Sequence, residues 1–184
     1  MFLMTDSTIL VAPRELKDQV ERASRVLLCE ASTADRLAED ITFCEINYGQ
    51  GISSWLEVIT SNSETFNKIL RSSLKLRLPS GRESVVINFD PSLPFAFLAR
   101  TLHTQENFGV TWSCDTEVTS GNSRITSVNL KFDTSISPIT NQKTVDALST
   151  GLRVSLLEWN QLNKIASQFL LSEEILMHLK FTSF

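Results

Sequence analysis

The chain has 184 residues, of which 42% are hydrophobic and 21% charged, and its formal net charge is −4. This length predicts a single domain with a substantial core, and the composition is typical of a globular protein. A nearly balanced, slightly acidic charge argues against nucleic acid or an anionic membrane as the partner.

Two further patterns bear on where the protein works. No apolar run approaches the roughly 20 residues that a membrane span requires, so we expect no membrane partner. Cys29, Cys44 and Cys114 have no CxxC spacing and lie among apolar neighbours. Unpaired thiols of this kind predict a reducing environment and a cytoplasmic location.

Apolar residues recur at helical spacing through residues 1–72. Pro13 suits the first turn of a helix, and Ser32 is a capping residue for the next one. The stretch 47–51, which contains two glycines, interrupts the pattern. The expected helices are residues 13–30, from Ser32 to this break, 52–60 and 64–71.

The pattern then changes to the two-residue period of strands. Alternation over 74–78 and 83–89, on either side of a Pro-Ser-Gly turn, predicts a β-hairpin. The apolar run 95–103 follows it. Frequent alanine in that run, and Arg100, which breaks any alternation, favour a short helix.

The clearest structural signal is a second hairpin over residues 108–132. With Gly121 at the turn, apolar residues of the two arms meet, and a shift of one residue would place each against a polar partner. The expected pairs are Val110 with Phe132, Trp112 with Leu130, Cys114 with Val128, Val118 with Arg124 and Glu117 with Ile125. Phe108 is expected on the same buried face, and Trp112 to be mostly buried.

The last part of the chain begins with a polar stretch, residues 134–150, which predicts a long loop. A final strand over 151–154 and a helix over 156–170 follow, and Ser172 is expected to cap one more helical segment. The fold class is therefore predicted to be α+β, with an antiparallel sheet built from hairpins and packed against the N-terminal helices and one C-terminal helix. The expected single domain, 1–184, comprises a helical part (1–72), strands (73–133), a loop (134–150) and a C-terminal helical part (151–184).

Motifs for metal, nucleotide or covalent catalysis are absent from the sequence. No glycine-rich phosphate loop follows a strand, and no nucleophile elbow is present. The two histidines, His103 and His178, have no metal-ligand spacing, and a structural role is favoured for both. We therefore expect no metal and no cofactor.

Two groups of residues remain as candidate binding sites. A pocket between helices and sheet is predicted from aromatic and charged residues near the helix break and the central strands: Glu45, Tyr48, Trp55, Arg100, His103 and Trp112. A basic stretch without acidic residues is a candidate anion site, through Lys68, Arg71, Lys75 and Arg77. The alternative for the basic stretch, a solvated face that protects an edge strand, is favoured.

Three segments carry a family resemblance. They are the opening helices, with Glu15-Leu16, Ala23, Ala38-Glu39 and Trp55-Leu56; the run from Pro91 to His103 ahead of a Trp-bearing strand; and the late pattern of Val154, Trp159, Leu162 and Ala166. Together they resemble an uncharacterised bacterial family catalogued as domain of unknown function 3726. The family ends in a Gly/Ala-rich, Asp-containing tail, whereas this chain has no glycine after Gly151. The resemblance implies a bacterial origin but no activity.

Two functional hypotheses follow. The favoured one is a non-catalytic binding or accessory protein that acts through a protein partner or a homo-oligomer surface. It rests on the missing catalytic motifs and the ordinary charge balance. The alternative is a small-molecule enzyme or ligand-binding domain that uses the pocket between helices and sheet.

Overall fold

The structure is a computed structural model that describes residues 7–27, 29–61, 63–76, 84–133 and 142–181. The chain divides into two compact units, Met1–Glu39 with Ala147–Phe184 (unit 1) and Asp40–Asp146 (unit 2). Both contain helices and antiparallel strands, which confirms the α+β class. The single domain expected from the length stays a prediction.

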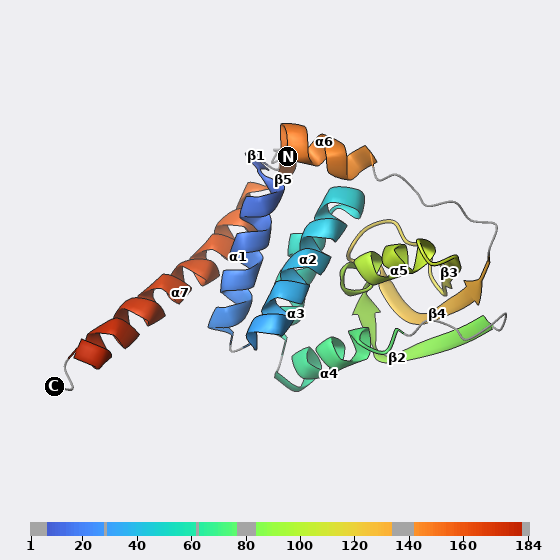
Figure 1. Ribbon diagram of the computed structural model, residues 1–184, viewed down its shortest axis with the longest axis horizontal. Coiled ribbons are helices and arrows are strands. Elements are labelled where there is room, and N and C mark those ends of the chain that lie inside the picture. The colour runs from blue at the N-terminus through green and yellow to red at the C-terminus, as the bar shows by residue number, and fades with distance from the viewer. Residues whose placement is uncertain (1–6, 28, 62, 77–83, 134–141, 182–184) are drawn as a thin grey trace, which may run out of the picture. The chain divides into compact units, whose positions relative to one another are not determined.

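Unit 1 contains a small sheet and a pair of helices. Strand β1 (Thr8–Val11) pairs antiparallel with β5 (Leu152–Ser155), and helix α1 (Pro13–Val26) lies alongside α7 (Leu156–Phe181), as Figure 1 shows. The apolar stripe of α1 is buried, and so are the residues of α7 that recur at the same spacing. These buried residues are Leu16, Val20 and Ala23 of α1, and Trp159, Leu162 and Ala166 of α7.

Three features of unit 1 differ from the sequence prediction or extend it. The helix α6 (Gln142–Thr150), which runs from unit 2 into unit 1, replaces the second half of the expected loop. The expected strand after Gly151 is confirmed, but its four-residue partner β1 was not predicted, because a strand so short carries little periodicity. The helix α7 is continuous past Ser172, where a new helix was expected. The packing of α7 on the hairpin sheet stays a prediction, since they belong to different units.

Helices α2 (Ala31–Tyr48), α3 (Gly51–Thr60) and α4 (Ser63–Ser73) follow as predicted. The break between α2 and α3 occurs because Gly49 and Gln50 both have left-handed backbone angles, φ +71° and +57°. Gly51 allows the two helices to approach closely, since an added Cβ would lie 2.6 Å from the Ile41 carbonyl oxygen.

The main sheet of unit 2 has the order β2 (Ser84–Pro94), β4 (Arg124–Phe132), β3 (Val110–Cys114). All of its described pairings are antiparallel. Figure 1 shows α4 beside β2 and the short helix α5 (Ala99–Glu106) beside β3. The register between β3 and β4 is the predicted one: Val110 with Phe132, Trp112 with Leu130 and Cys114 with Val128.

The hairpin is shorter than predicted on its turn side. Asp115 ends β3, because its carboxylate accepts the backbone N–H groups of Thr126 and Ser127 at 3.1 and 2.9 Å. Val118 and Glu117 therefore do not pair with β4. Instead Arg124 and Ile125 pair with Pro94 and Leu93 of β2, and Ile125 is fully buried. The turn prediction is confirmed: Gly121 lies in a turn closed by a hydrogen bond from Ser123 N to Ser120 O, 3.1 Å long.

Of the two aromatic residues expected on the buried face near β3, Phe108 is the one whose predicted burial is wrong. Trp112 is half-buried, and Phe108 lies before the strand and is 61% exposed. The reason is that β3 is an edge strand covered by a helix of only eight residues.

The hairpin predicted over 74–89 is also corrected. Leu74 is 62% exposed and lies in the turn that ends α4, and residues 77–83 lie outside the described part of the chain. The strand predicted at 83–89 exists as β2, but the strand that pairs with it is β4. Alternation identified the strand correctly and the partner wrongly, because a two-residue period carries no information on pairing.

The helix expected over 95–103 is confirmed as a short 3₁₀ turn, Phe95–Phe97, followed by α5. Its buried residues include Phe95, Phe97 and Leu102. No helix in the described ranges combines the length and the apolar character that crossing a membrane would require.

Candidate functional site

Unit 2 contains a cleft of about 470 Å³. It is formed by the last turns of α2, one face of α5 and the start of α6. On α5, the cleft residues recur at spacings of three and four, whereas Ala99, Leu102 and Gln105 on the opposite face are buried. The lining residues are Phe43, Asn47, Tyr48, Arg100, His103, Thr104, Glu106, Asn107, Gln142 and Lys143.

Four polar side chains form a continuous chain of polar contacts at this cleft. The Tyr48 hydroxyl lies 2.5 Å from His103 Nε2, and His103 Nδ1 lies 2.9 Å from Glu106 Oε2. The other carboxylate oxygen of Glu106 accepts a hydrogen bond of 2.7 Å from the indole N–H of Trp112. The chain therefore joins α2, α5 and β3.

The carboxylate of Glu106 determines which imidazole nitrogen carries the proton. A carboxylate cannot donate a hydrogen, so the tautomer with hydrogen on Nδ1 is the one that suits this contact. In the neutral imidazole, Nε2 then has a lone pair and accepts the hydrogen of the Tyr48 hydroxyl. His103 is thus oriented as a base, with the Tyr48 hydroxyl as its partner.

Tyr48 remains protonated at neutral pH. Burial, followed by the negative charge of Glu106, raises the pKa of Tyr48 to about 12. Its ring packs edge-on against Phe95, with ring centroids 4.9 Å apart. His103 lies in the same aromatic cluster, 5.2 Å from Phe43 and 5.9 Å from Trp112 between ring centroids.

Two basic side chains lie at the cleft. Arg100 Nε donates to Asp40 Oδ1 at 2.7 Å, and the Asp40 side chain is only 2% exposed. Lys143 is exposed, and its ammonium donates to the backbone oxygen of Asn47 at 2.8 Å. The Lys143 contact places an ammonium group at the residue that precedes Tyr48.

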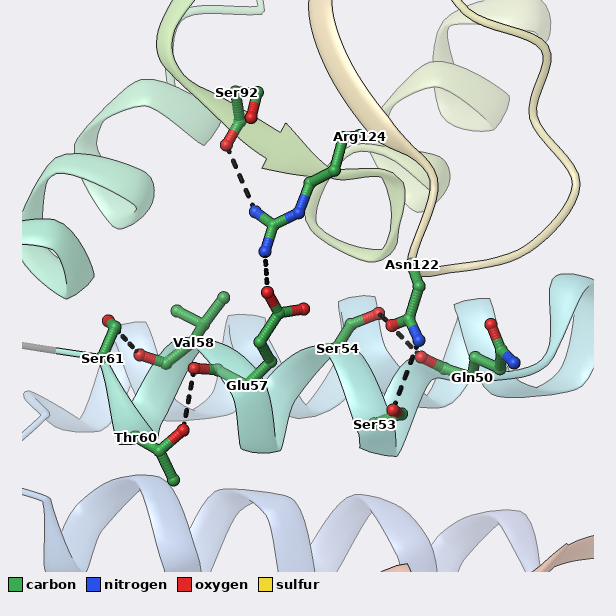
Figure 2. A network of polar contacts seen from close by, with 10 residues as sticks. All are labelled: Gln50, Ser53, Ser54, Glu57, Val58, Thr60, Ser61, Ser92, Asn122 and Arg124. Carbon is green, nitrogen blue, oxygen red and sulfur yellow. Dashed lines mark hydrogen bonds and ion pairs between the residues drawn. The ribbon is translucent and has the colours of Figure 1, made fainter.

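A second polar network holds the turn around Gly121 on the α2–α3 break (Figure 2). Gly121 donates to the Gly49 backbone oxygen at 3.0 Å, and an added Cβ at Gly121 would lie 2.7 Å from Cys44 Sγ. Asn122 Oδ1 lies 2.5 Å from the hydroxyl of Ser54, which is fully buried. The turn is thus held against the backbone just after Tyr48.

The same network extends along α3. In Figure 2, Arg124 of β4 bridges Glu57 and the backbone oxygen of Ser92. The hydroxyls of Thr60 and Ser61 donate to backbone oxygens of α3 itself and so close the end of the helix. Through the contacts of Arg124, α3 is linked to β2 and β4.

Of the six residues in the predicted pocket, the structure brings four together. Tyr48, Arg100 and His103 line the cleft, and Trp112 joins them through Glu106. The other two have structural positions. Trp55 is 1% exposed, and Glu45 accepts the backbone N–H of Ile52 at 2.9 Å, which caps the start of α3.

Sequence reasoning missed Glu106 and Asp40. Glu106 follows His103 at the i+3 spacing of a helix, a signal that would have indicated the pair. Asp40 lies outside the apolar stripe of Leu37, Ile41 and Cys44, a position that predicts solvent exposure, but it is 1% exposed. Its contact with Arg100 depends on tertiary packing and has no local signal.

The basic stretch is not assembled as a strand face. Lys68 pairs with Glu64 on α4 at 2.7 Å, and Lys75 lies in the turn after α4. Arg71 belongs to the last turn of α4, while Arg77 lies outside the described residues. The anion site at this stretch stays a prediction.

The cysteines are free thiols without the features of a reactive site. Cys44 is buried, and burial raises its pKa. Burial also raises the pKa of Cys29, and that of Cys114 to about 11. Raised pKa values keep the thiols protonated and unreactive at neutral pH. In the described ranges, no three His, Cys, Asp or Glu side chains are placed to hold a metal ion together.

Comparison with known proteins yields no match to any family model, curated protein or solved structure. The resemblance to the bacterial family of unknown function stays a prediction. The functional argument therefore depends on the cleft itself.

Proposed function

We propose that unit 2 binds a small organic anion in the cleft between α2, α5 and α6. The observation that carries this proposal is the cleft of about 470 Å³, in which the rings of Phe43 and Tyr48 lie among converging polar groups. Its volume lies in the ordinary range for small-molecule sites. The proposal corresponds to the alternative hypothesis of the sequence analysis.

The charges at the cleft favour an anionic ligand. Lys143 is exposed, and Arg100 is 33% exposed above its buried partner Asp40. Among the described lining residues the one acidic residue is Glu106, and both of its oxygens are already engaged, one 2.9 Å from His103 Nδ1 and the other accepting a hydrogen bond from Trp112. A carboxylate or phosphate would therefore meet a cationic rim.

Titration followed by nuclear magnetic resonance tests the proposal, with pyruvate, succinate and inorganic phosphate as probes. At least one probe is expected to shift the indole N–H signal of Trp112, which reports on the cleft through Glu106. The chain has three tryptophans, so each indole signal can be assigned by substitution.

A matched pair of lysine variants locates the site. Lys143→Gln should weaken binding about tenfold, as expected for the loss of one charge-assisted contact. Lys75→Gln removes an equally exposed lysine outside the cleft and should change nothing. Absence of shifts with all three probes, or a larger effect of Lys75→Gln, would contradict the proposal and favour the basic stretch or another function.

A protein partner or homo-oligomer remains a second proposal, favoured by exposed leucines in unit 1. Leu10, Leu148 and Leu157 are 59%, 69% and 67% exposed. Exposed apolar residues of this size support a contact surface only if they act together. Light scattering after chromatography should show a lower mass for the variant with all three leucines replaced by serine; an unchanged monomeric mass in both proteins would exclude the homo-oligomer.

We also propose a bacterial cytoplasmic location. The free thiols of Cys29, Cys44 and Cys114 support a reducing compartment. The net charge of −4 supports the proposal that nucleic acid is not a partner. Fractionation of the native host would test the location.

A further inference from the structure

We infer that Glu106, His103 and Tyr48 form a proton relay, and that the cleft catalyses proton transfer to and from the carbon next to the carbonyl of a small oxo acid. The inference rests on the proposed function, since the oxo acid is one kind of small organic anion. It goes further in assigning an activity and a role to each residue.

The geometry is that of a base held by an orienting group. Glu106 Oε2 lies 2.9 Å from Nδ1 of His103, and on the other side of the ring Nε2 lies 2.5 Å from the Tyr48 oxygen. Both distances are within hydrogen-bond range, and the order carboxylate, imidazole, hydroxyl is the one that acid–base catalysis uses. Trp112 holds the other Glu106 oxygen, so the carboxylate cannot rotate freely.

All three relay residues line the cleft, which distinguishes them from a polar network that only ties helices together. The side chains of His103 and Glu106 are 26% and 16% exposed, and Tyr48 is half-buried. The network around Asn122, by contrast, includes a fully buried hydroxyl, that of Ser54. The relay is thus the network that a bound molecule can reach.

The transfer step balances without any added oxidant or reductant. The C–H bond next to the carbonyl breaks, its proton bonds to the Tyr48 oxygen, and its electron pair forms the enolate. In the same step the phenolic proton of Tyr48 moves to His103 Nε2. The imidazolium so formed keeps its Nδ1 hydrogen bond to the Glu106 carboxylate, and the reverse step returns a proton to carbon.

Tyr48 acts as the conduit and His103 as the base. Burial and Glu106 disfavour the phenolate of Tyr48, so the side chain is a neutral phenol before and after the step and must release one proton as it takes up another. An imidazole accepts it readily, because the ordinary pKa of histidine lies near neutrality. Tyr48 and His103 are the catalytic residues, and Glu106 is a positioning residue.

The acid group of the substrate follows from the charge at the cleft. Lys143 binds the backbone oxygen of Asn47, the residue before Tyr48, which keeps its ammonium near the relay. A carboxylate bound at Lys143 would bring the rest of the oxo acid into the cleft that the relay residues line. The same positive charge stabilises the enolate as it forms.

Exchange of pyruvate methyl protons in D₂O, followed by proton magnetic resonance, tests the inference. The wild-type protein should accelerate the exchange above the buffer rate. Tyr48→Phe and His103→Gln should each lower the protein-dependent rate by about 100-fold or more, in the range that general acid–base catalysis contributes. Lys75→Gln, outside the cleft, should exchange at the wild-type rate, and thermal unfolding should confirm that each variant is folded.

The positioning role of Glu106 has a separate readout. The chain has two histidines, so the imidazole ¹⁵N signals of His103 can be assigned with the His103→Gln variant. The wild-type spectrum should show hydrogen on Nδ1. Glu106→Gln should alter this tautomer and shift the pH profile of exchange, and Glu106→Asp should restore part of the rate.

The outcomes separate the inference from the proposed function. Pyruvate that shifts the Trp112 signal but exchanges no faster than in buffer overturns the relay and leaves the binding site standing. Exchange that persists in Tyr48→Phe or His103→Gln also overturns the relay. If pyruvate causes neither a signal shift nor faster exchange, the relay is overturned. Shifts with succinate or phosphate would then still support anion binding.

Discussion

Two polar networks in the described part of unit 2 differ in what lies beside them. The network of Figure 2 fastens the turn around Gly121 to α3 through Ser53, Ser54 and Asn122. The other network runs from Tyr48 through His103 to Glu106 and lines the cleft. The first joins parts of the protein to each other, whereas the second can also contact a bound molecule.

The comparison shows that hydrogen bonding alone does not identify a site. A hydroxyl buried as completely as that of Ser54 must have a partner, because an unpaired buried polar group costs free energy. The relay residues are partly exposed, so burial does not demand their arrangement. The two networks should therefore respond differently to substitution, the first through stability and the second through chemistry.

The largest effect on stability is expected from breaking the ion pair between Arg100 and Asp40. Arg100→Met removes a guanidinium from the Asp40 carboxylate, which is 2% exposed. Loss of one partner of a buried pair should lower the free energy of unfolding by about 3–5 kcal/mol. Urea denaturation measures this change in the free energy of unfolding. The double variant with Asp40→Leu should recover most of the loss; a single variant as stable as the wild type would show that the pair contributes little.

Gly121→Ala should have the next largest effect on stability, because it disrupts the turn that the network of Figure 2 holds. The added Cβ would lie 2.7 Å from Cys44 Sγ and 2.9 Å from the Gly49 backbone oxygen. Overpacking of this kind should cost about 3 kcal/mol. Gly49→Ala is the matched control: it meets no atom within 4 Å, and its φ of +71° alone should cost about 1 kcal/mol. Equal losses of stability in Gly121→Ala and Gly49→Ala would contradict the close packing around Gly121.

Tyr48 should make stability depend on alkaline pH. Its pKa is raised to about 12 in the folded protein, above the value of about 10 for an unfolded chain. The folded state therefore holds the proton more tightly, so the stabilisation is complete below about pH 10 and is lost as the pH rises toward 12. Tyr48→Phe should remove this part of the slope.

The chain has one tyrosine, so the ultraviolet absorbance of its phenolate measures the pKa directly. A midpoint near the ordinary tyrosine value would contradict the burial of Tyr48 and the effect of the negative charge of Glu106. The difference between wild type and Tyr48→Phe in urea midpoint, measured across the alkaline range, cancels the lysines that titrate in the same range.

The smallest effect is expected for the ion pair between Glu57 and Arg124. Their side chains are 52% and 40% exposed, so solvent screens the charges. Glu57→Gln should change the free energy of unfolding by about 0.5 kcal/mol, and less at high salt. A loss of stability as large as that of Gly121→Ala would mean that this exposed part of the Figure 2 network is structurally essential.

Part of the candidate site was accessible to prediction. Tyr48, Arg100, His103 and Trp112 were selected as aromatic and charged residues near the helix break and the strands, and they do come together. Glu45 satisfied the same criterion but caps α3, and Trp55 is in the core. Composition and position near a break cannot separate a residue that faces a cleft from one that faces its own helix.

Local patterns in the chain were sufficient for the helices, the break at Gly49, and the register of β3 with β4, because each depends on spacing within a short segment. Long-range packing decided the rest. It paired β2 with β4, left Trp112 half-buried on an edge strand, and placed Asp40 against Arg100 and Glu106 between His103 and Trp112. These contacts join residues from different elements, and periodicity along a chain does not specify which elements meet.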